Sequence, residues 1–149
     1  EQYKAYISDP QALLMLSDEC KLMAESFDVF MESGTQLNDN IKTAEFADES
    51  CLSGAKAIKN KLDGGCISTY LKPKELKQIE DYIDKKGFSH MRPNRVQHVY
   101  KARFNSTGYD KIKVFQYVNL GTGVSTDLFC TNEKNELISI ARTVPRAIE

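Results

Sequence analysis

The sequence lacks the short motifs that identify many enzymes and the long apolar runs that span membranes. Its 149 residues contain no G-x-S-x-G, no phosphate-binding glycine loop, no H-E-x-x-H and no C-x-x-C pair. The longest strongly apolar run, residues 12–16, is far too short to cross a bilayer. With only 8 Gly and 4 Pro, and 41% apolar residues, the composition is typical of a globular protein. We therefore expect one domain over residues 1–149.

Histidine is also scarce, which argues against a metal site. The two histidines, His90 and His98, lie eight residues apart with no cysteine near them in sequence. We expect no metal and no cofactor. His98 falls on the more apolar face of a predicted strand, which favours a hydrogen-bonded core histidine over a catalytic one.

Charge is divided unevenly along the chain, although the net charge is only −1. Residues 1–65 contain 6 Lys and 12 acidic residues, a net of −6, whereas residues 66–149 contain 14 basic and 9 acidic residues, a net of +5. The asymmetry favours either docking of the two halves on each other or a surface for a partner. The pI of 6.2 argues against nucleic acid binding.

The first half is predicted to be helical. Asp9 and Pro10 have the residue types of a helix start, and apolar residues then recur at steps of three or four until Gly34. A second such stripe runs from Ile41 to Leu62. If the chain turns near residue 35, the two stripes face each other level by level, which predicts an antiparallel helical hairpin.

Four cysteines carry the strongest constraint. In the predicted hairpin Cys20 lies opposite Cys51, which favours a disulfide between them, and Cys66 and Cys130 are then left for each other. The alternative is reduced core cysteines, since buried free cysteine is common. An even cysteine count and a first residue, Glu1, that is not methionine suggest export with a removed signal peptide or anchor, or a truncated chain. The expected location is periplasmic or extracellular, with membrane proximity through a removed N-terminal segment.

The second half is predicted to form a sheet. After a short strand from Cys66 to Leu71, a third helix spans Pro73–Lys86, and period-two alternation then predicts strands over residues 96–104, 111–118, 124–130 and 137–143. Short connections imply an antiparallel meander. The predicted class is α+β, with the helical part at 9–87 packed on a four-stranded sheet at 96–143.

Two groups of polar side chains are candidates for function. Arg92, Arg95, Lys101 and Arg103 lie in the most basic and aromatic stretch and are candidates for binding an acidic protein partner, against the alternative of a solvated loop and strand face. Tyr100, Tyr117 and Asp127 are the obvious acid–base candidates if a pocket exists. Asn105-Ser-Thr matches the N-glycosylation triplet, which matters only in a eukaryotic secretory setting.

Two resemblances point to the bacterial envelope. Over about a third of the chain, Tyr3-Lys4, Asp9-Pro10, Glu19-Cys20-Lys21 and Asp48-Glu-Ser-Cys51 with Gly54-Ala55 resemble the short pattern of bacterial entry-exclusion lipoproteins from conjugative plasmids. The predicted element order is similar to that of nuclear-transport-factor-2-like and cystatin-like domains. Periplasmic domains of type IV secretion machinery resemble the same architecture.

The sequence thus favours a non-catalytic exported module that binds another protein, in an envelope or secretion assembly. An inhibitor or immunity protein against a toxin or hydrolase is one alternative. A small-molecule-binding or enzymatic domain with a pocket between sheet and helices is another.

Overall fold

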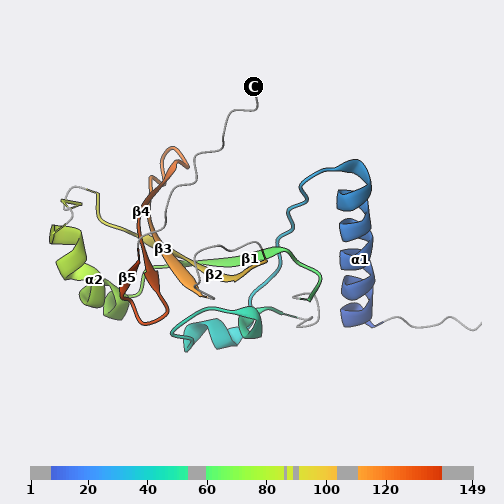
Figure 1. Ribbon diagram of the computed structural model, residues 1–149. Coiled ribbons are helices and arrows are strands. Elements are labelled where there is room, and N and C mark those ends of the chain that lie inside the picture. The colour runs from blue at the N-terminus through green and yellow to red at the C-terminus, as the bar shows by residue number, and fades with distance from the viewer. Residues whose placement is uncertain (1–7, 54–59, 86, 89–90, 104–110, 139–149) are drawn as a thin grey trace, which may run out of the picture.

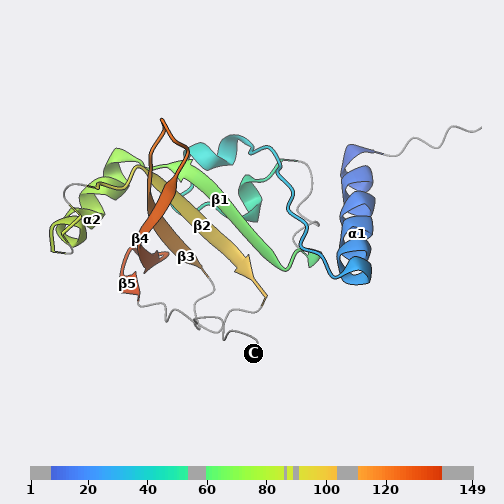
Figure 2. The same cartoon turned by 90° about the horizontal axis from the view of Figure 1, so that it is seen from above.

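An antiparallel sheet forms the body of the molecule, and one long helix stands beside it (Figures 1 and 2). The computed structural model describes residues 8–53, 60–85, 87–88, 91–103 and 111–138. Within these residues the elements follow in the order α1 (Asp9–Phe27), η1 (Asp39–Lys42), η2 (Glu49–Cys51), β1 (Gly64–Tyr70), α2 (Pro73–Lys85), β2 (Arg95–Ala102), β3 (Ile112–Val118), β4 (Ser125–Asn132) and β5 (Leu137–Ile138).

The sheet has five strands in the order β1-β2-β3-β4-β5, and every neighbouring pair is antiparallel. The α+β class is therefore broadly right, but the four-stranded meander is wrong. The short strand predicted at 66–71 is β1, and it joins the sheet at its edge beside β2. Helix α2, predicted almost to the residue, lies between β1 and β2 in the sequence.

The N-terminal helical hairpin is also wrong. Helix α1 begins after Ser8 and ends at Phe27, well before Gly34, because Asp28 adopts the left-handed conformation with φ 52°. The predicted second helix is replaced by the two short 3₁₀ turns η1 and η2, and its residues 54–59 lie outside the described residues.

Local side-chain hydrogen bonds explain why residues 38–52 do not form a long helix. The Asn38 Oδ1 atom accepts from the Asn40 backbone N–H at 2.9 Å, and Asp48 Oδ1 accepts from the Ser50 N–H at 2.9 Å. Such contacts compete with helical backbone bonds and start new turns instead. The segment is closed on itself by an isolated bridge between Leu37 and Leu52.

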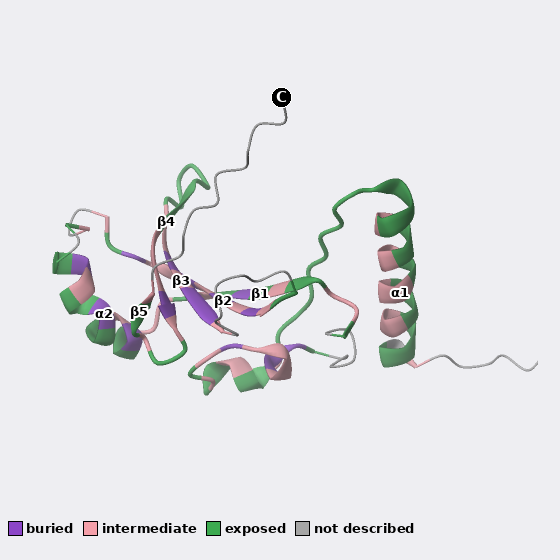
Figure 3. Ribbon diagram, in the orientation of Figure 1, coloured by how far each residue is buried: buried purple, intermediate pink, exposed green. Residues whose placement is uncertain are grey.

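One face of the sheet is covered, and it carries both parts of the core (Figure 3). Helix α2 packs Ile79 and Ile83 on Val96 and Phe115. The segment 38–52 packs on the same face farther along β1 and β2, where a second apolar cluster consists of Ala47, Cys51, Leu52, Ile67 and Tyr100. The core is therefore two apolar clusters on one sheet face, and polar residues lie between them.

Candidate functional site

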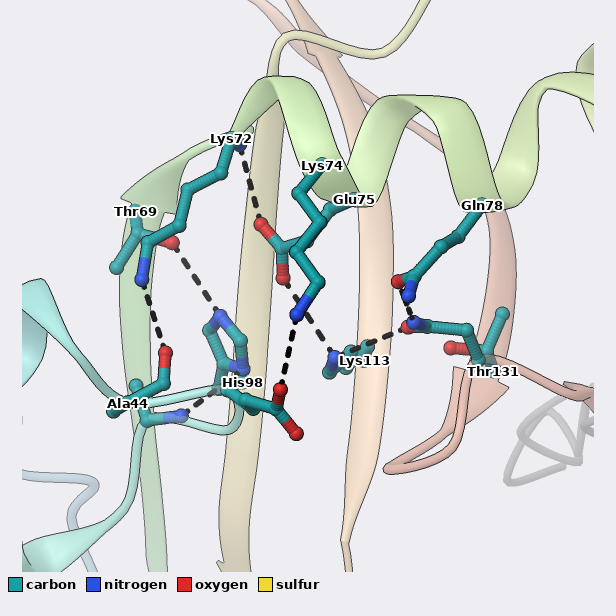
Figure 4. A network of polar contacts seen from close by, with 12 residues as sticks. Ala44, Thr69, Lys72, Lys74, Glu75, Gln78, His98, Lys113 and Thr131 are labelled. Atoms are coloured by element: carbon teal, nitrogen blue, oxygen red, sulfur yellow. Dashed lines mark hydrogen bonds and ion pairs between the residues drawn. The ribbon is translucent and has the colours of Figure 1, made fainter.

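A row of buried polar side chains crosses the covered face of the sheet between the two apolar clusters. His98 on β2 lies in register with Lys113 on β3, and Lys113 with Thr131 on β4. Their exposed fractions are 3%, 2% and 0%. Figure 4 shows this row beneath α2, from which Glu75 and Gln78 reach down toward it.

Lys113 is the most unusual member of this row because a lysine is almost never fully buried without a partner. Its Nζ atom lies 3.6 Å from Oε1 of Glu75, which is itself only 8% exposed, and donates to Oδ1 of Asn135 at 3.0 Å. The Asn135 amide in turn donates to Gln78 at 2.6 Å. Burial lowers the pKa of Lys113, while the neighbouring Glu75 carboxylate opposes that shift.

His98 is held as a neutral imidazole. Its Nδ1 atom accepts from the Ala47 backbone N–H at 3.3 Å, so the ring proton belongs on Nε2, which faces the Thr69 hydroxyl at 3.4 Å. Burial lowers its pKa to about 4, and the positive charges of Lys113 and Lys72 add to the shift. The prediction of a hydrogen-bonded core histidine is confirmed.

Lysines at the start of α2 tie this helix to the segment 38–52. Lys72 Nζ donates to the carbonyl oxygens of Ala44 at 3.0 Å and Ile41 at 3.3 Å. Lys74 pairs with Glu45 at 3.2 Å on the surface above them. The Lys72 backbone N–H also donates to the Glu75 carboxylate at 3.2 Å. This carboxylate therefore accepts a hydrogen bond at the start of α2 in addition to pairing with Lys113.

This polar row links helix α2 and the segment 38–52 to the sheet, and we call it the polar brace. Among the described residues, every buried side-chain nitrogen and oxygen has a hydrogen-bond partner. Both ring nitrogens of His98 have a partner, and the Lys113 ammonium is paired with the Glu75 carboxylate.

The three acid–base candidates do not come together. Tyr100 lies in the apolar cluster at one end of β2, and burial raises its pKa. Tyr117 pairs with Thr126 near the opposite end of the sheet, because β3 runs antiparallel to β2. Asp127 is exposed and accepts from the Gln116 amide at 2.7 Å.

The four basic candidates are spread along the molecule. Arg92 pairs with Glu80 at 3.5 Å, and Arg103 with Asp63 at 2.7 Å. The Arg95 guanidinium lies 3.8 Å from the centroid of the Tyr70 ring. Lys101 is half-buried near the end of β2. Eight residues of extended chain separate Arg95 from Arg103, about 26 Å, so the four do not form one compact patch.

The four cysteines are free thiols in four different places. Cys51 is fully buried in the cluster around Ala47, and Cys20 is half-buried on α1. Cys66 lies on β1 and Cys130 on β4, three strand spacings apart, which is roughly 14 Å and more than a disulfide can bridge. The hairpin that placed Cys20 level with Cys51 does not exist. The geometric argument for Cys20–Cys51 is thereby removed, and with it the elimination that left Cys66 and Cys130 for each other.

The outer face of α1 is a feature that the sequence analysis assigned to the core. Its inner side is half-buried and mixed: Asp18 pairs with Lys61 at 2.6 Å and Lys21 with Asp63 at 3.3 Å, beside the half-buried apolar residues Leu13, Leu14, Cys20 and Ala24. Its outer edge is exposed (green in Figure 3). The large apolar residues that α1 exposes are Met15 (58%), Leu16 (59%), Leu22 (56%), Met23 (49%) and Phe27 (70%).

The described part of the chain contains neither a metal-ligand cluster nor a membrane-spanning helix. No cluster of three or more His, Cys, Asp or Glu side chains could hold a metal ion there. No helix of the described residues has both the length and the apolar character needed to cross a membrane.

The fold and its buried polar brace define a small α+β module, and comparison with known proteins adds one relative. No family model matches the chain, and no solved structure matches it. The chain is 42% identical over 140 residues to the SPbeta prophage-derived uncharacterized protein YorI of Bacillus subtilis (strain 168). The match covers 91% of this chain but 27% of the relative, so the chain spans about a quarter of the relative's length.

Proposed function

We propose that this chain is a non-catalytic protein-interaction module, and that α1 with the residues directly after it is its docking element. The observation that carries the proposal is the orientation of α1. Its outward side exposes five large apolar side chains with Glu19 among them, whereas its inward side is half-buried and carries both apolar and charged residues.

The energetics favour a covered outer face. Burying one large aliphatic or aromatic side chain contributes about 1.5–3 kcal/mol, and α1 leaves Leu16, Met23 and Phe27 about half or more exposed. Beyond the helix end Phe30 is 91% exposed. Several large exposed apolar side chains on one side of a helix are typical of an interaction site in a soluble protein.

The charged contacts beneath α1 do not account for its position. The pairs Asp18–Lys61 and Lys21–Asp63 involve side chains that are 27–52% exposed. Such pairs contribute at most about 1 kcal/mol each. The inner side of this 19-residue helix also half-buries Leu13, Leu14 and Ala24, but its largest apolar side chains are exposed, so packing them against a partner would add to its stability.

The polar brace supports the non-catalytic part of the proposal, because Lys113, Glu75 and His98 are engaged with one another or with the backbone. Export and membership of an envelope assembly stay predictions of the sequence. The dispersal of the cysteines leaves them without structural support.

Site-specific photo-crosslinking tests the proposal. A benzophenone amino acid in place of Met23, on the outer face of α1, is expected to give discrete adducts in cells that make the protein. The same group in place of Leu120, which is 73% exposed in the turn between β3 and β4, is the matched control. Equal yields at both positions, or the absence at Met23 of both adducts to other proteins and crosslinks within the polypeptide, would remove α1 as a docking element.

A further inference from the structure

The residues that follow α1 have the apolar composition of a buried strand but are exposed to solvent. Val29, Phe30 and Met31 are 50%, 91% and 42% exposed, and no strand pairs with residues 29–36 among the described residues. Consecutive β-branched, aromatic and other large apolar residues are typical of a strand that is covered on both faces. In an extended chain Phe30 points to one face and its two neighbours to the other, so both faces are apolar.

The join between α1 and this run is compact. Asp28, in the left-handed conformation, reverses the chain, and the Val29 N–H donates to the Ala24 carbonyl at 3.1 Å. Helix and run are therefore connected by a single residue, as short as the helix-to-strand connections of α/β units. The apolar residues at the end of α1 and in the run, such as Phe27 and Phe30, are therefore only a few residues apart in the sequence.

We infer that α1 and residues 28–31 are one helix–strand unit, and that the strand is inserted into a second β-sheet formed by an adjoining part of a longer polypeptide. The inference rests on the proposed function and names the occupant of the docking element. In the relative, about three quarters of the length lies outside the matched segment, which is ample for at least one further domain.

A second copy of the chain is a poorer occupant for geometric reasons. A two-fold contact brings the same surface patch of each copy together and covers one face of the unit. The run 29–31 needs a backbone partner at its edges and apolar layers on both faces. A sheet that receives the strand, with α1 lying across it, satisfies both requirements.

Hydrogen exchange measured by mass spectrometry tests this inference. In the 149-residue chain the amides of residues 30–33 are expected to exchange within seconds. In full-length YorI the corresponding amides are expected to exchange roughly a thousandfold more slowly, as in a paired strand. The turn at 119–124 provides the control, because it is expected to exchange equally in both proteins.

Two results would overturn the inference. Equal exchange of these amides in both proteins would exclude the inserted strand, even where Met23 still forms crosslinks, and the proposed function would then stand without it. Protection that appears in the 149-residue chain as its concentration rises would assign the face to a second copy.

A matched pair of variants gives a second readout. The Phe30→Asp substitution is expected to leave the melting temperature of the 149-residue chain unchanged, because Phe30 is 91% exposed there. The corresponding substitution in full-length YorI is expected to lower its melting temperature by several degrees. Leu120→Asp is the control, and an equal response of both variants in both proteins would contradict the inference.

Discussion

Lys113 Nζ lies 3.6 Å from Glu75 Oε1, and this ion pair joins the middle of the sheet to the first turn of α2 beneath the protein surface. Burial of two opposite charges is costly, so the pair is worth less as a source of net stability than as a constraint. Removal of either partner, however, leaves the charge of the other buried without a counter-charge. The position of α2 on the sheet depends on both partners.

The Glu75→Gln substitution is therefore expected to destabilise the protein by about 3 kcal/mol, because the Lys113 ammonium loses its counter-charge while still buried. The measurement is the free energy of unfolding in urea. Glu45→Gln is the matched control, since Glu45 pairs with Lys74 at a side chain that is 87% exposed, and its cost is expected to stay below about 1 kcal/mol. Equal costs for the two variants would show that the buried pair is no constraint.

Acid is expected to weaken the fold through His98. Its folded pKa of about 4 lies below the ordinary value of 6.5, so the unfolded state binds more protons between these values. The contribution of His98 to the free energy of unfolding is complete above pH 6.5. It falls by roughly 3 kcal/mol as the pH drops to about 4, and this group causes no further change below that pH. The charges that face the ring are those of Lys113 and Lys72, and both add to the lowering of its pKa.

The comparison with His98→Asn isolates this effect, because other titrating groups contribute equally to both proteins. The difference in unfolding free energy between wild type and variant is expected to shrink as the pH falls from 6.5 to 4. Parallel pH profiles for the two proteins would contradict a neutral buried His98.

The strands were predictable because each obeys a single local rule. Alternation placed Val96, His98 and Tyr100 on one face of β2, and all three are buried there. For β3 the same rule separates the two faces but does not show which one is covered, and Lys113 and Phe115 occupy the covered face. Burial of a lysine can be predicted only when its acidic partner can be identified, and Glu75 lies 38 residues away in the sequence, on a helix.

The second helix failed for a different reason. The stripe from Ile41 onward correctly found buried residues, since Ala47 and Cys51 are 2% and 0% exposed. Helical spacing alone does not show that a helix forms, and the side-chain bonds of Asn38 and Asp48 divide this segment into short turns. The outer face of α1 was assigned to a core because apolar stripes look the same whether their partner lies inside or outside the chain.

Thiol reactivity is expected to follow burial. Cys66 is exposed on β1 and should be alkylated first. Cys130 is half-buried, and burial followed by the charge of Asp127 raises its pKa, which lowers its thiolate fraction. Cys51 is fully buried and should react only on unfolding. Timed alkylation followed by mass spectrometry checks this order, and two reductant-sensitive pairs would instead restore the disulfide prediction and its link to export.

Gly65 is expected to be intolerant of any side chain, because a Cβ atom there would overlap the ring of Tyr100 on the neighbouring strand. The strand is already irregular at this point, with a register shift between Gly65 and Cys66, and Tyr100 belongs to the cluster that holds Ala47 and Cys51. Displacing the ring would open that cluster, so Gly65→Ala should cost about 1–3 kcal/mol, as overpacking typically does. Gly64→Ala is the matched control, since a Cβ atom there would meet only the Lys101 carbonyl oxygen at 3.8 Å, an ordinary contact distance. Denaturant midpoints that fall equally for the two variants would show that the close approach of Tyr100 to β1 does not constrain this edge of the sheet.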